Sequence, residues 1–326
     1  MKMHVYFPLL KRSIFKIHFI ALLLLFSHSV AQEQQSLNSL TFEKDLIPEG
    51  IAIDTKTKKV YINSLKHNKI VRCNLDGSDP ENFIEENEYG YLPGFGMTIK
   101  GDTLFALGNS LTKTDNKSIL LLLNTLTGDL IKSYSIDNSE FIYLNDVAIS
   151  NDGTLFITDS ESNAIYTINK SDDSLDVFYS NDEIKHSNGI ALSSDNTLLY
   201  FASYASGIRT FDIAHKKLVN KSNQFKGIDG MKFYKNSLIG IVNSRRHASQ
   251  NGVYRFHLDE EHSKITHQEK LMAFMKSTDI PTTFAIVEDS MCFIADSQMD
   301  ILDQQTNEII DASKLEKYQL IKLKLH

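Results

Sequence analysis

The stretch HSNGIALSS at residues 186–194 places an Asn-Gly pair directly before a short apolar run. Aligning the chain on its core, NGIAL at 188–192, reveals five related stretches: EGIAI at 49–53, FGMTI at 95–99, NDVAI at 145–149, DGMKF at 229–233 and TTFAI at 282–286. Their first positions are 41 to 53 residues apart. Repeats of this length are typical of β-propeller blades, so six repeats predict six blades.

Each repeat continues in the same way after its first apolar run. A polar turn follows, such as SNDG at 150–153 or SSDN at 193–196, and then a second apolar run. Four repeats show a clear third run, for example AIYTINK at 164–170. Asn, Asp, Gly and Ser between short β-branched and aromatic runs are typical of β-hairpins. The sequence therefore predicts an all-β fold, a six-bladed β-propeller with four-stranded blades around a central channel.

The ends of the repeat region predict how the ring closes. SLTFEKDL at 39–46 and YQLIKLKL at 318–325 fall outside complete repeats, so we expect one of them to complete a blade that the other begins. Closure removes exposed sheet edges. No linker-like or low-complexity segment interrupts the repeats, and residues 32–326 are predicted to form a single domain.

The first 31 residues have the pattern of a secretory signal peptide. Four basic residues precede the apolar run at 17–26, and SVA at 29–31 leads into polar QEQQ. The apolar run is too short to span a bilayer comfortably, although an uncleaved membrane anchor is the alternative. We expect cleavage after Ala31 and a secreted or periplasmic protein.

Charge and cysteine usage narrow the function classes. Removing residues 1–31 takes away four of 34 basic residues and none of the 41 acidic ones, which moves the formal net charge from −7 to −11. Such a chain is not expected to bind nucleic acid, and residues 32–326 contain no segment apolar enough to cross a membrane. Cys73 and Cys292 are more typical of small buried side chains than of a disulfide.

The alignment also predicts a metal site. The first strand of a propeller blade lines the channel, so the residues that open the six runs should form a ring at one mouth: Glu49, Phe95, Asn145, Asn188, Asp229 and Thr282. Four of them carry carboxylate or amide oxygens. Oxygen-only ligands with two negative charges suit Ca²⁺, while Zn²⁺ and Mn²⁺ are less favoured alternatives. The competing interpretation is that Asn, Asp and Gly are ordinary turn formers before strands.

Four motifs together resemble one known family. IPEGIAID, LNDVAISNDGTLFITDS, HSNGIALSSDNTLLYFA and GIDGMKF are similar, in this order, to gluconolactonases, senescence-marker proteins and regucalcin-like proteins. The resemblance spans roughly residues 40 to 320. It implies a six-bladed propeller with one divalent metal in the channel, held by Glu49, Asn188 and Asp229, with Asn145 at the metal or one water away. It also makes Asp229 a candidate general base. The family's substrate-gripping Arg has no convincing match here.

Loops at the same mouth supply further candidates. His186, two residues before Asn188, is a candidate acid or base, although a loop His bonded to solvent or backbone is the competing interpretation. His67, Tyr143, Tyr204 and Arg245 are candidate substrate contacts.

These observations lead to three functional hypotheses. The first is a metal-dependent lactone or ester hydrolase acting on a small molecule. The second is a non-catalytic propeller that binds a ligand or protein and uses the cation structurally. The third is a propeller similar to strictosidine synthase, which the more distant resemblance suggests and which needs no channel cation.

Overall fold

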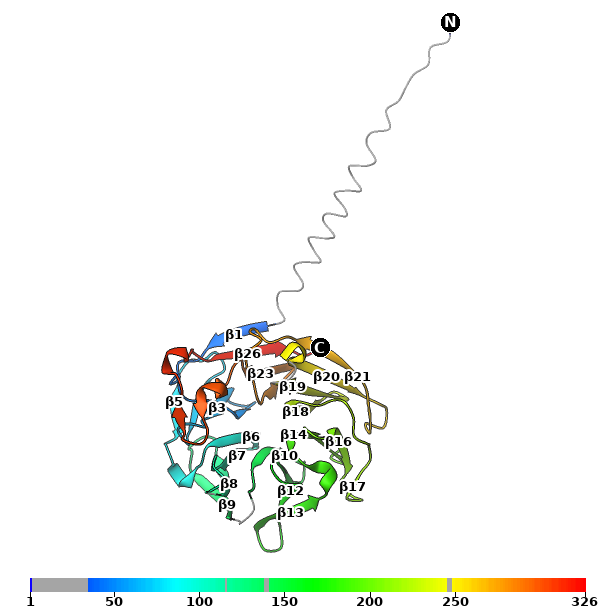
Figure 1. Ribbon diagram of the computed structural model, residues 1–326, viewed down its shortest axis with the longest axis horizontal. Coiled ribbons are helices and arrows are strands. Elements are labelled where there is room, and N and C mark those ends of the chain that lie inside the picture. The colour runs from blue at the N-terminus through cyan, green and yellow to red at the C-terminus, as the bar shows by residue number, and fades with distance from the viewer. Residues whose placement is uncertain (2–34, 115, 138–140, 245–247) are drawn as a thin grey trace.

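The computed structural model describes residues 1, 35–114, 116–137, 141–244 and 248–326. Within these ranges the chain forms six four-stranded antiparallel sheets arranged around a central axis (Figure 1). The predicted six-bladed propeller is therefore confirmed. The expected signal peptide falls almost entirely in residues 2–34, outside the described residues. No helix in the described ranges is long and apolar enough to cross a membrane.

The first five blades follow the chain from the innermost strand outward. Blade 1 contains β2 (Ile51–Ile53), β3 (Lys59–Asn63), β4 (Ile70–Asn74) and β5 (Glu81–Ile84), and blade 2 contains β6 (Gly94–Lys100), β7 (Thr103–Asn109), β8 (Lys117–Asn124) and β9 (Leu130–Asp137). Blade 3 contains β10 (Leu144–Ile149), β11 (Leu155–Asp159), β12 (Ala164–Asn169) and β13 (Ser174–Ser180). Blade 4 contains β14 (Ser187–Leu192), β15 (Leu198–Ser203), β16 (Gly207–Asp212) and β17 (Lys217–Leu218), and blade 5 contains β18 (Ile228–Tyr234), β19 (Ser237–Val242), β20 (Gly252–Leu258) and β21 (Ile265–Met272).

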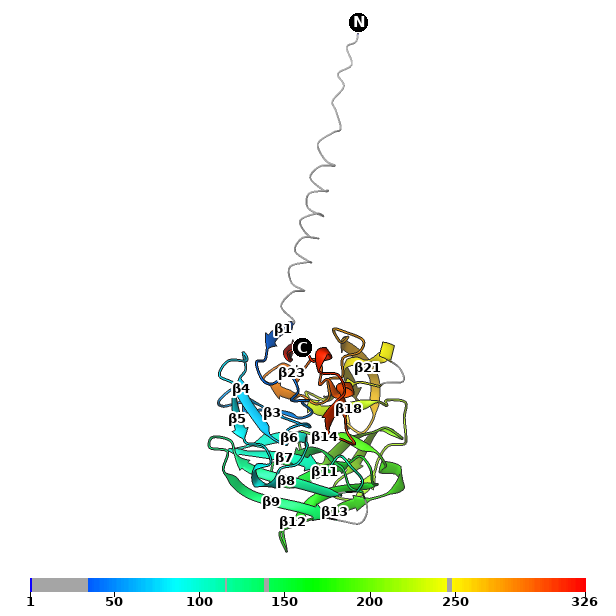
Figure 2. The ribbon, with the colours of Figure 1, turned by 60° about the vertical axis from the view of Figure 1, so that its left-hand side comes forward.

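The sixth blade joins the two ends of the described chain (Figures 1 and 2). It contains, from inside to outside, β22 (Ala285–Val287), β23 (Ser290–Ile294), β26 (Gln319–Lys324) and β1 (Gln35–Ser39). The predicted closure is confirmed, but the N-terminal strand precedes the expected 39–46 run. Between β23 and β26 the chain makes an excursion with a small sheet of β24 (Leu302–Asp303) and β25 (Glu308–Ile309). Short 3-10 helices occupy Glu88–Gly90, Asp182–Ile184, Ala248–Gln250, Met299–Ile301 and Ala312–Lys314.

Apolar side chains fill the spaces between neighbouring blades. Successive residues of a strand point to opposite faces. Here one face of each blade packs on the preceding blade, and the other face packs on the following blade. In β3, Val60 and Ile62 pack against blade 6, whereas Tyr61 packs against blade 2. Burial on both faces explains why the second strand of each blade is almost continuously apolar. Cys73 and Cys292 are free thiols buried in the core between blades 6 and 1, and burial raises the pKa of Cys292 to about 11.

Candidate metal centre at one mouth of the channel

The six residues that open the repeats lie where the inner strands begin, at one end of the channel, which we call the anchor mouth. In four blades a β-bulge interrupts the inner ladder at this point. In β14 the pairing shifts between Ser187 and Ile190, so that Asn188 and Gly189 lie within the bulge. Bulges are common beside functional sites because they re-aim a side chain. Here each bulge contains the predicted anchor residue.

Glycines allow neighbouring inner strands to approach each other closely. A Cβ atom added to the glycine after an anchor would meet the carbonyl oxygen of the next blade's anchor: Gly50 at 2.0 Å from Phe95, Gly96 at 2.5 Å from Asn145, Gly189 at 2.2 Å from Asp229 and Gly230 at 2.8 Å from Thr282. The other two blades use hydroxyl groups. Thr158 Oγ1 donates to the Asn188 carbonyl over 2.6 Å, and Thr282 Oγ1 donates to the Glu49 carbonyl over 2.6 Å. The anchor backbones therefore form a continuous ring.

Four anchor side chains each contribute a buried oxygen that accepts no hydrogen bond from the described residues. These atoms are Glu49 Oε2, Asn145 Oδ1, Asn188 Oδ1 and Asp229 Oδ1. The four residues are 5–7% exposed. Buried polar atoms are nearly always paired, so four unpaired acceptors from four blades are unusual. Two carboxylates and two amide oxygens are the donor set of a hard divalent cation.

The same amides are oriented by their nitrogen atoms. Asn188 Nδ2 donates to the Tyr204 hydroxyl over 3.3 Å, and Asn145 Nδ2 makes a long contact of 3.5 Å with Ser160 Oγ. Asn243 Nδ2 donates to Asp229 Oδ2 over 2.7 Å. The surrounding protein thus binds the nitrogens and one carboxylate oxygen, and it leaves an oxygen of each anchor without a partner.

The two buried carboxyl groups are difficult to ionise on their own. Burial raises the pKa of Glu49 well above its ordinary value, and the charges of Asp229 and Asp146 raise it further. Burial also raises the pKa of Asp229 to about 6, although hydrogen bonds from Asn243 and Asn188 oppose this shift. A cation bound between these groups would offset their desolvation and mutual repulsion.

The donor set differs from that of a zinc site. The described residues contain no cluster of three or more His, Cys, Asp or Glu side chains suited to a metal ion. The candidate site has only two carboxylates, and its other donors are amides. Its chemistry fits Ca²⁺ better than Zn²⁺, which prefers Cys and His.

Comparison with known proteins agrees with this architecture. The sequence profile of the SMP-30/Gluconolactonase/LRE-like region matches residues 47–237, more than half of the chain. The chain belongs to this family. The match covers all four residues that carry the unpaired oxygens. A search of curated proteins found no significant match.

Several solved structures share the fold of this protein at low sequence identity. A gluconolactonase from Xanthomonas campestris is 13% identical with a TM-score of 0.57, covering 89% of this chain and 90% of its own. Regucalcin from Agrobacterium tumefaciens, described as a calcium-binding protein, is 14% identical with a TM-score of 0.54, covering 89% and 95%. A virginiamycin B lyase from Staphylococcus aureus is 19% identical with a TM-score of 0.60, covering 90% and 100%. These likenesses establish the fold alone, because propellers support many activities.

His186 and the two candidate tyrosines lie beside the candidate metal centre. His186 Nδ1 lies 3.0 Å from the carbonyl oxygen of Ser160, the residue whose hydroxyl contacts Asn145. The Tyr204 hydroxyl contacts Asn188. The Tyr143 ring packs edge-on against Phe95 with centroids 4.6 Å apart. Burial and the charge of Glu49 raise the pKa of the Tyr143 hydroxyl.

The structure does not bring His67 to the centre. His67 Nε2 lies 3.2 Å from Asp45 Oδ2, and its backbone N–H donates to Ser64 Oγ. Among the described residues, no hydrogen bond or ion pair joins His67 to the four anchor side chains. Arg245 lies outside the described residues, and its role stays a prediction.

An apolar wall borders the centre on the side of blades 2 and 3. Phe95, Leu144 and Leu302 belong to one buried cluster, and Tyr143 and Met299 pack against it. Leu302 and Met299 come from the excursion between β23 and β26. Asn307 Nδ2 donates to the Lys66 carbonyl over 3.1 Å, which ties this excursion to the loop between β3 and β4. The excursion therefore contributes to the anchor mouth.

Sequence reasoning missed a second polar position in the repeat. An Asn or Asp near the end of the second strand binds the backbone where the chain enters an inner strand. In four cases the side-chain Oδ1 accepts a hydrogen bond from a backbone N–H: Asn63 from Gly50, Asn109 from Leu144, Asp159 from Tyr143 and Asp296 from Ile280. In the fifth case Asn243 Nδ2 donates to the Pro281 carbonyl. The Asn-Ser and Asp-Ser pairs at 63–64, 109–110, 159–160, 243–244 and 296–297 were the available signal. Asn243 has the additional role of contacting Asp229.

Proposed function

We propose that this protein is a divalent-cation-dependent hydrolase of small lactones or esters, with Ca²⁺ as the preferred ion. The main support for this proposal is the set of four buried, unpaired oxygens on Glu49, Asn145, Asn188 and Asp229. These residues would hold the ion. Membership of a family whose name includes gluconolactonase supports the reaction class.

The chemistry divides between the ion and the protein. When bound, the ion would supply Lewis acidity that polarises a carbonyl oxygen. Asp229 is the proposed base for the attacking water, since Asn243 orients one carboxylate oxygen and leaves the other for the centre. His186 is the proposed auxiliary acid or base. Its Nδ1 is engaged by the Ser160 carbonyl, which leaves Nε2 for proton transfer.

The side chains around the centre would bind the substrate. Phe95 and Tyr143 offer an apolar surface beside Glu49, and Tyr204 offers a hydroxyl beside Asn188. His67 and Arg245 are kept as weaker candidates. The N-terminal pattern favours a secreted or periplasmic location, where free Ca²⁺ is available to a site of moderate affinity.

The test combines elemental analysis of purified protein with a panel of lactones and aryl esters, each with and without chelator. We expect one equivalent of Ca²⁺, turnover of at least one substrate, and loss of turnover on chelation. Asp229→Asn keeps an oxygen at the centre but removes the base, so kcat should fall about 10²–10⁴-fold. Asp195→Asn, in the exposed turn after β14, is the matched control and should retain activity.

Two outcomes contradict the proposal. Bound cation without turnover on the whole panel would favour a non-catalytic propeller with a structural ion. Turnover that persists in the metal-free protein would exclude a metal-dependent reaction and reopen the comparison with metal-independent propellers.

A further inference from the structure

A third carboxylate lies beside the two of the candidate centre. Asp146 follows Asn145 at the position where four other blades have a glycine: Gly50, Gly96, Gly189 and Gly230. Its side chain is 1% exposed. Oδ1 accepts from the backbone N–H of Val147 over 2.8 Å, and Oδ2 accepts from that of Ile190 over 3.3 Å. The carboxylate is thus fixed between β10 and β14.

Lys232 provides the positive charge opposite this carboxylate. It lies on β18, three residues after Asp229, and its Nζ is 3.4 Å from Asp146 Oδ1 and 3.3 Å from Oδ2. The bulge in β18 allows both Asp229 and Lys232 to face the channel. The Lys232 side chain is 22% exposed. The pair therefore connects blades 3 and 5 across blade 4.

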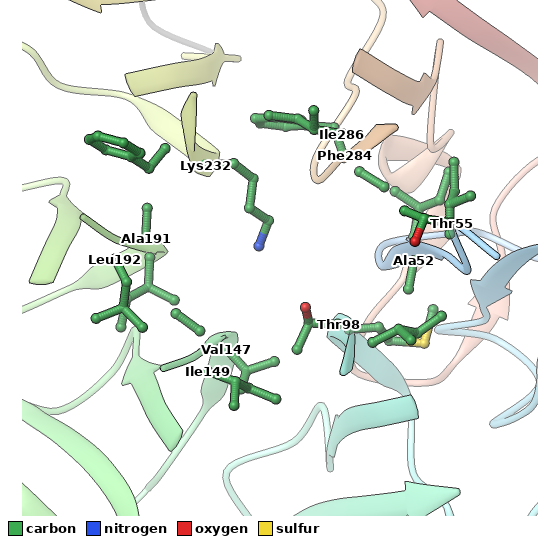
Figure 3. A pocket seen from close by; sticks show the side chains of 18 of the residues that line it. Ala52, Thr55, Thr98, Val147, Ile149, Ala191, Leu192, Lys232, Phe284 and Ile286 are labelled. Atoms are coloured by element: carbon green, nitrogen blue, oxygen red, sulfur yellow. The ribbon is translucent and has the colours of Figure 1, made fainter. Parts of the chain in front are cut away.

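The pair stands where the channel opens into a cavity at the opposite mouth. This cavity has a volume of about 430 Å³ and is lined by residues that follow the anchors on all six inner strands. Figure 3 shows the Lys232 side chain reaching into its middle, between Ala191, Val147, Thr98 and Phe284. The ammonium group thus lies inside the channel rather than on the outer surface.

The net charge of four side chains in the channel is equal and opposite to the charge of a divalent cation. Glu49, Asp229 and Asp146 contribute three negative charges when ionised, and Lys232 contributes one positive charge. We propose that Lys232 offsets the charge of Asp146, which keeps the net charge of these four side chains at −2 and thereby tunes the candidate centre toward divalent rather than trivalent cations. This inference rests on the cation site of the proposed function, but not on its catalytic role.

A charge-setting role differs measurably from a structural one. The Coulomb energy between Lys232 and a bound ion is proportional to the charge of the ion. Removing the lysine should therefore change the logarithm of the affinity for Tb³⁺ one and a half times as much as that for Ca²⁺. A change in packing or backbone position would not follow this ratio, because the two ions are similar in size.

The experiment measures ion binding to metal-stripped protein by titration calorimetry, without substrate. Lys232→Met should tighten Ca²⁺ about tenfold or more and Tb³⁺ about 30-fold or more, whereas Asp146→Asn should weaken both with the same ratio of logarithms. The double variant restores the net charge, so its Ca²⁺ affinity should return to within about threefold of wild type. Lys100→Met is the control, since the Lys100 ammonium on the inner strand β6 contacts backbone oxygens, including that of Asn151.

The outcomes separate this inference from the proposed function. If wild-type protein binds no divalent ion, the candidate centre itself is wrong. If wild type binds Ca²⁺ but each single variant shifts the logarithms of the Ca²⁺ and Tb³⁺ affinities equally, the charge-setting role is wrong. It is also wrong if Lys232→Met and Asp146→Asn shift the affinities in the same direction as each other. Thermal unfolding of each metal-free variant, followed by circular dichroism, verifies that every protein titrated is folded.

Discussion

Gly189 lies so close to Asp229 that a Cβ atom at position 189 would come within 2.2 Å of the Asp229 carbonyl oxygen. The contact joins the inner strands of blades 4 and 5 at the level of the candidate ligands. The contact gives the Asn-Gly pair a physical role. Asn188 contributes an oxygen to the candidate metal centre, and Gly189 leaves space for blade 5 to bring the Asp229 carboxylate close to that oxygen. The same relationship recurs between Gly50 and Phe95 and between Gly96 and Asn145.

Gly189→Ala should disrupt both stability and ion binding. The added methyl group meets backbone atoms of Asp229 and Met231, which cannot move away as a flexible side chain would. We expect a loss of about 1–3 kcal/mol in the free energy of unfolding, measured by urea denaturation, and weaker Ca²⁺ binding by calorimetry. Gly101→Asn is the control, because its turn has a left-handed φ of 62°, which asparagine tolerates, and open space around it. Equal stability of the two variants would contradict the close-approach argument.

The number of blades and the positions of the anchor residues were predictable because the repeat is defined by short local sequence patterns. Short apolar runs, hairpin turns and a constant phase depend only on neighbouring residues. The outermost strand β1 was misplaced because it contains Gln35 to Ser39, which are mostly exposed and show no apolar alternation. An edge strand with one paired side needs little hydrophobic signal, so its sequence resembles a loop.

Contacts between blades could not be predicted in the same way. The pairing of Asp146 with Lys232 joins residues 86 positions apart, and only the closed ring brings them together. The glycine that follows four of the anchors resembles a turn residue in the sequence, whereas in the structure it allows strands of different blades to approach closely. Asn243 was similarly hidden, because the Asn-Ser pair that follows its strand also occurs in blade 2, whose anchor Phe95 is not a candidate ligand.

Removing the cation should lower thermal stability. An ion that binds only the folded state stabilises it by about 2.7 kcal/mol at a hundredfold excess over Kd. We therefore expect the Tm of wild type to fall on addition of chelator and to recover with Ca²⁺, as followed by differential scanning fluorimetry. Glu49→Gln/Asp229→Asn should show the same Tm with and without Ca²⁺. A calcium effect that persists in this double variant would place the ion elsewhere.

The Glu49 and Asp229 carboxyl groups should make the metal-free protein less stable as pH rises. Burial raises the folded-state pKa of Asp229 to about 6 and that of Glu49 well above its ordinary value, so the folded state binds these protons more tightly than the unfolded chain. Their stabilising effect is complete below the unfolded values near pH 4 and is lost as pH rises through about 6 and beyond. Urea denaturation at several pH values in chelator tests this trend. The Glu49→Gln/Asp229→Asn variant should have a flatter profile, and an unchanged slope would contradict the assignment.

Two histidines at the anchor mouth allow a matched comparison. His186→Gln should lower kcat about 10²-fold or more if the imidazole transfers a proton, with little change in Ca²⁺ affinity, because its ring contacts the Ser160 carbonyl rather than a candidate ligand. His67→Gln should leave kcat within about threefold, since His67 is engaged by Asp45. Steady-state kinetics on the same substrate measure both. Equal losses in the two variants would remove His186 from the reaction.

Asn243 should act on the ion through Asp229. Its Nδ2 donates to Asp229 Oδ2 over 2.7 Å and to the Pro281 carbonyl over 2.9 Å. Loss of such a supporting hydrogen bond typically weakens metal binding by about 10–100-fold, which we expect for Asn243→Ala in calorimetric titration with Ca²⁺. Asn109→Ala is the matched control: Asn109 ends the second strand of blade 2 and binds the Leu144 backbone, with no candidate ligand side chain. Both variants should lose stability, but only Asn243→Ala should lose affinity. A similar loss of affinity in both would mean that the blade framework, rather than the bond to Asp229, controls the centre.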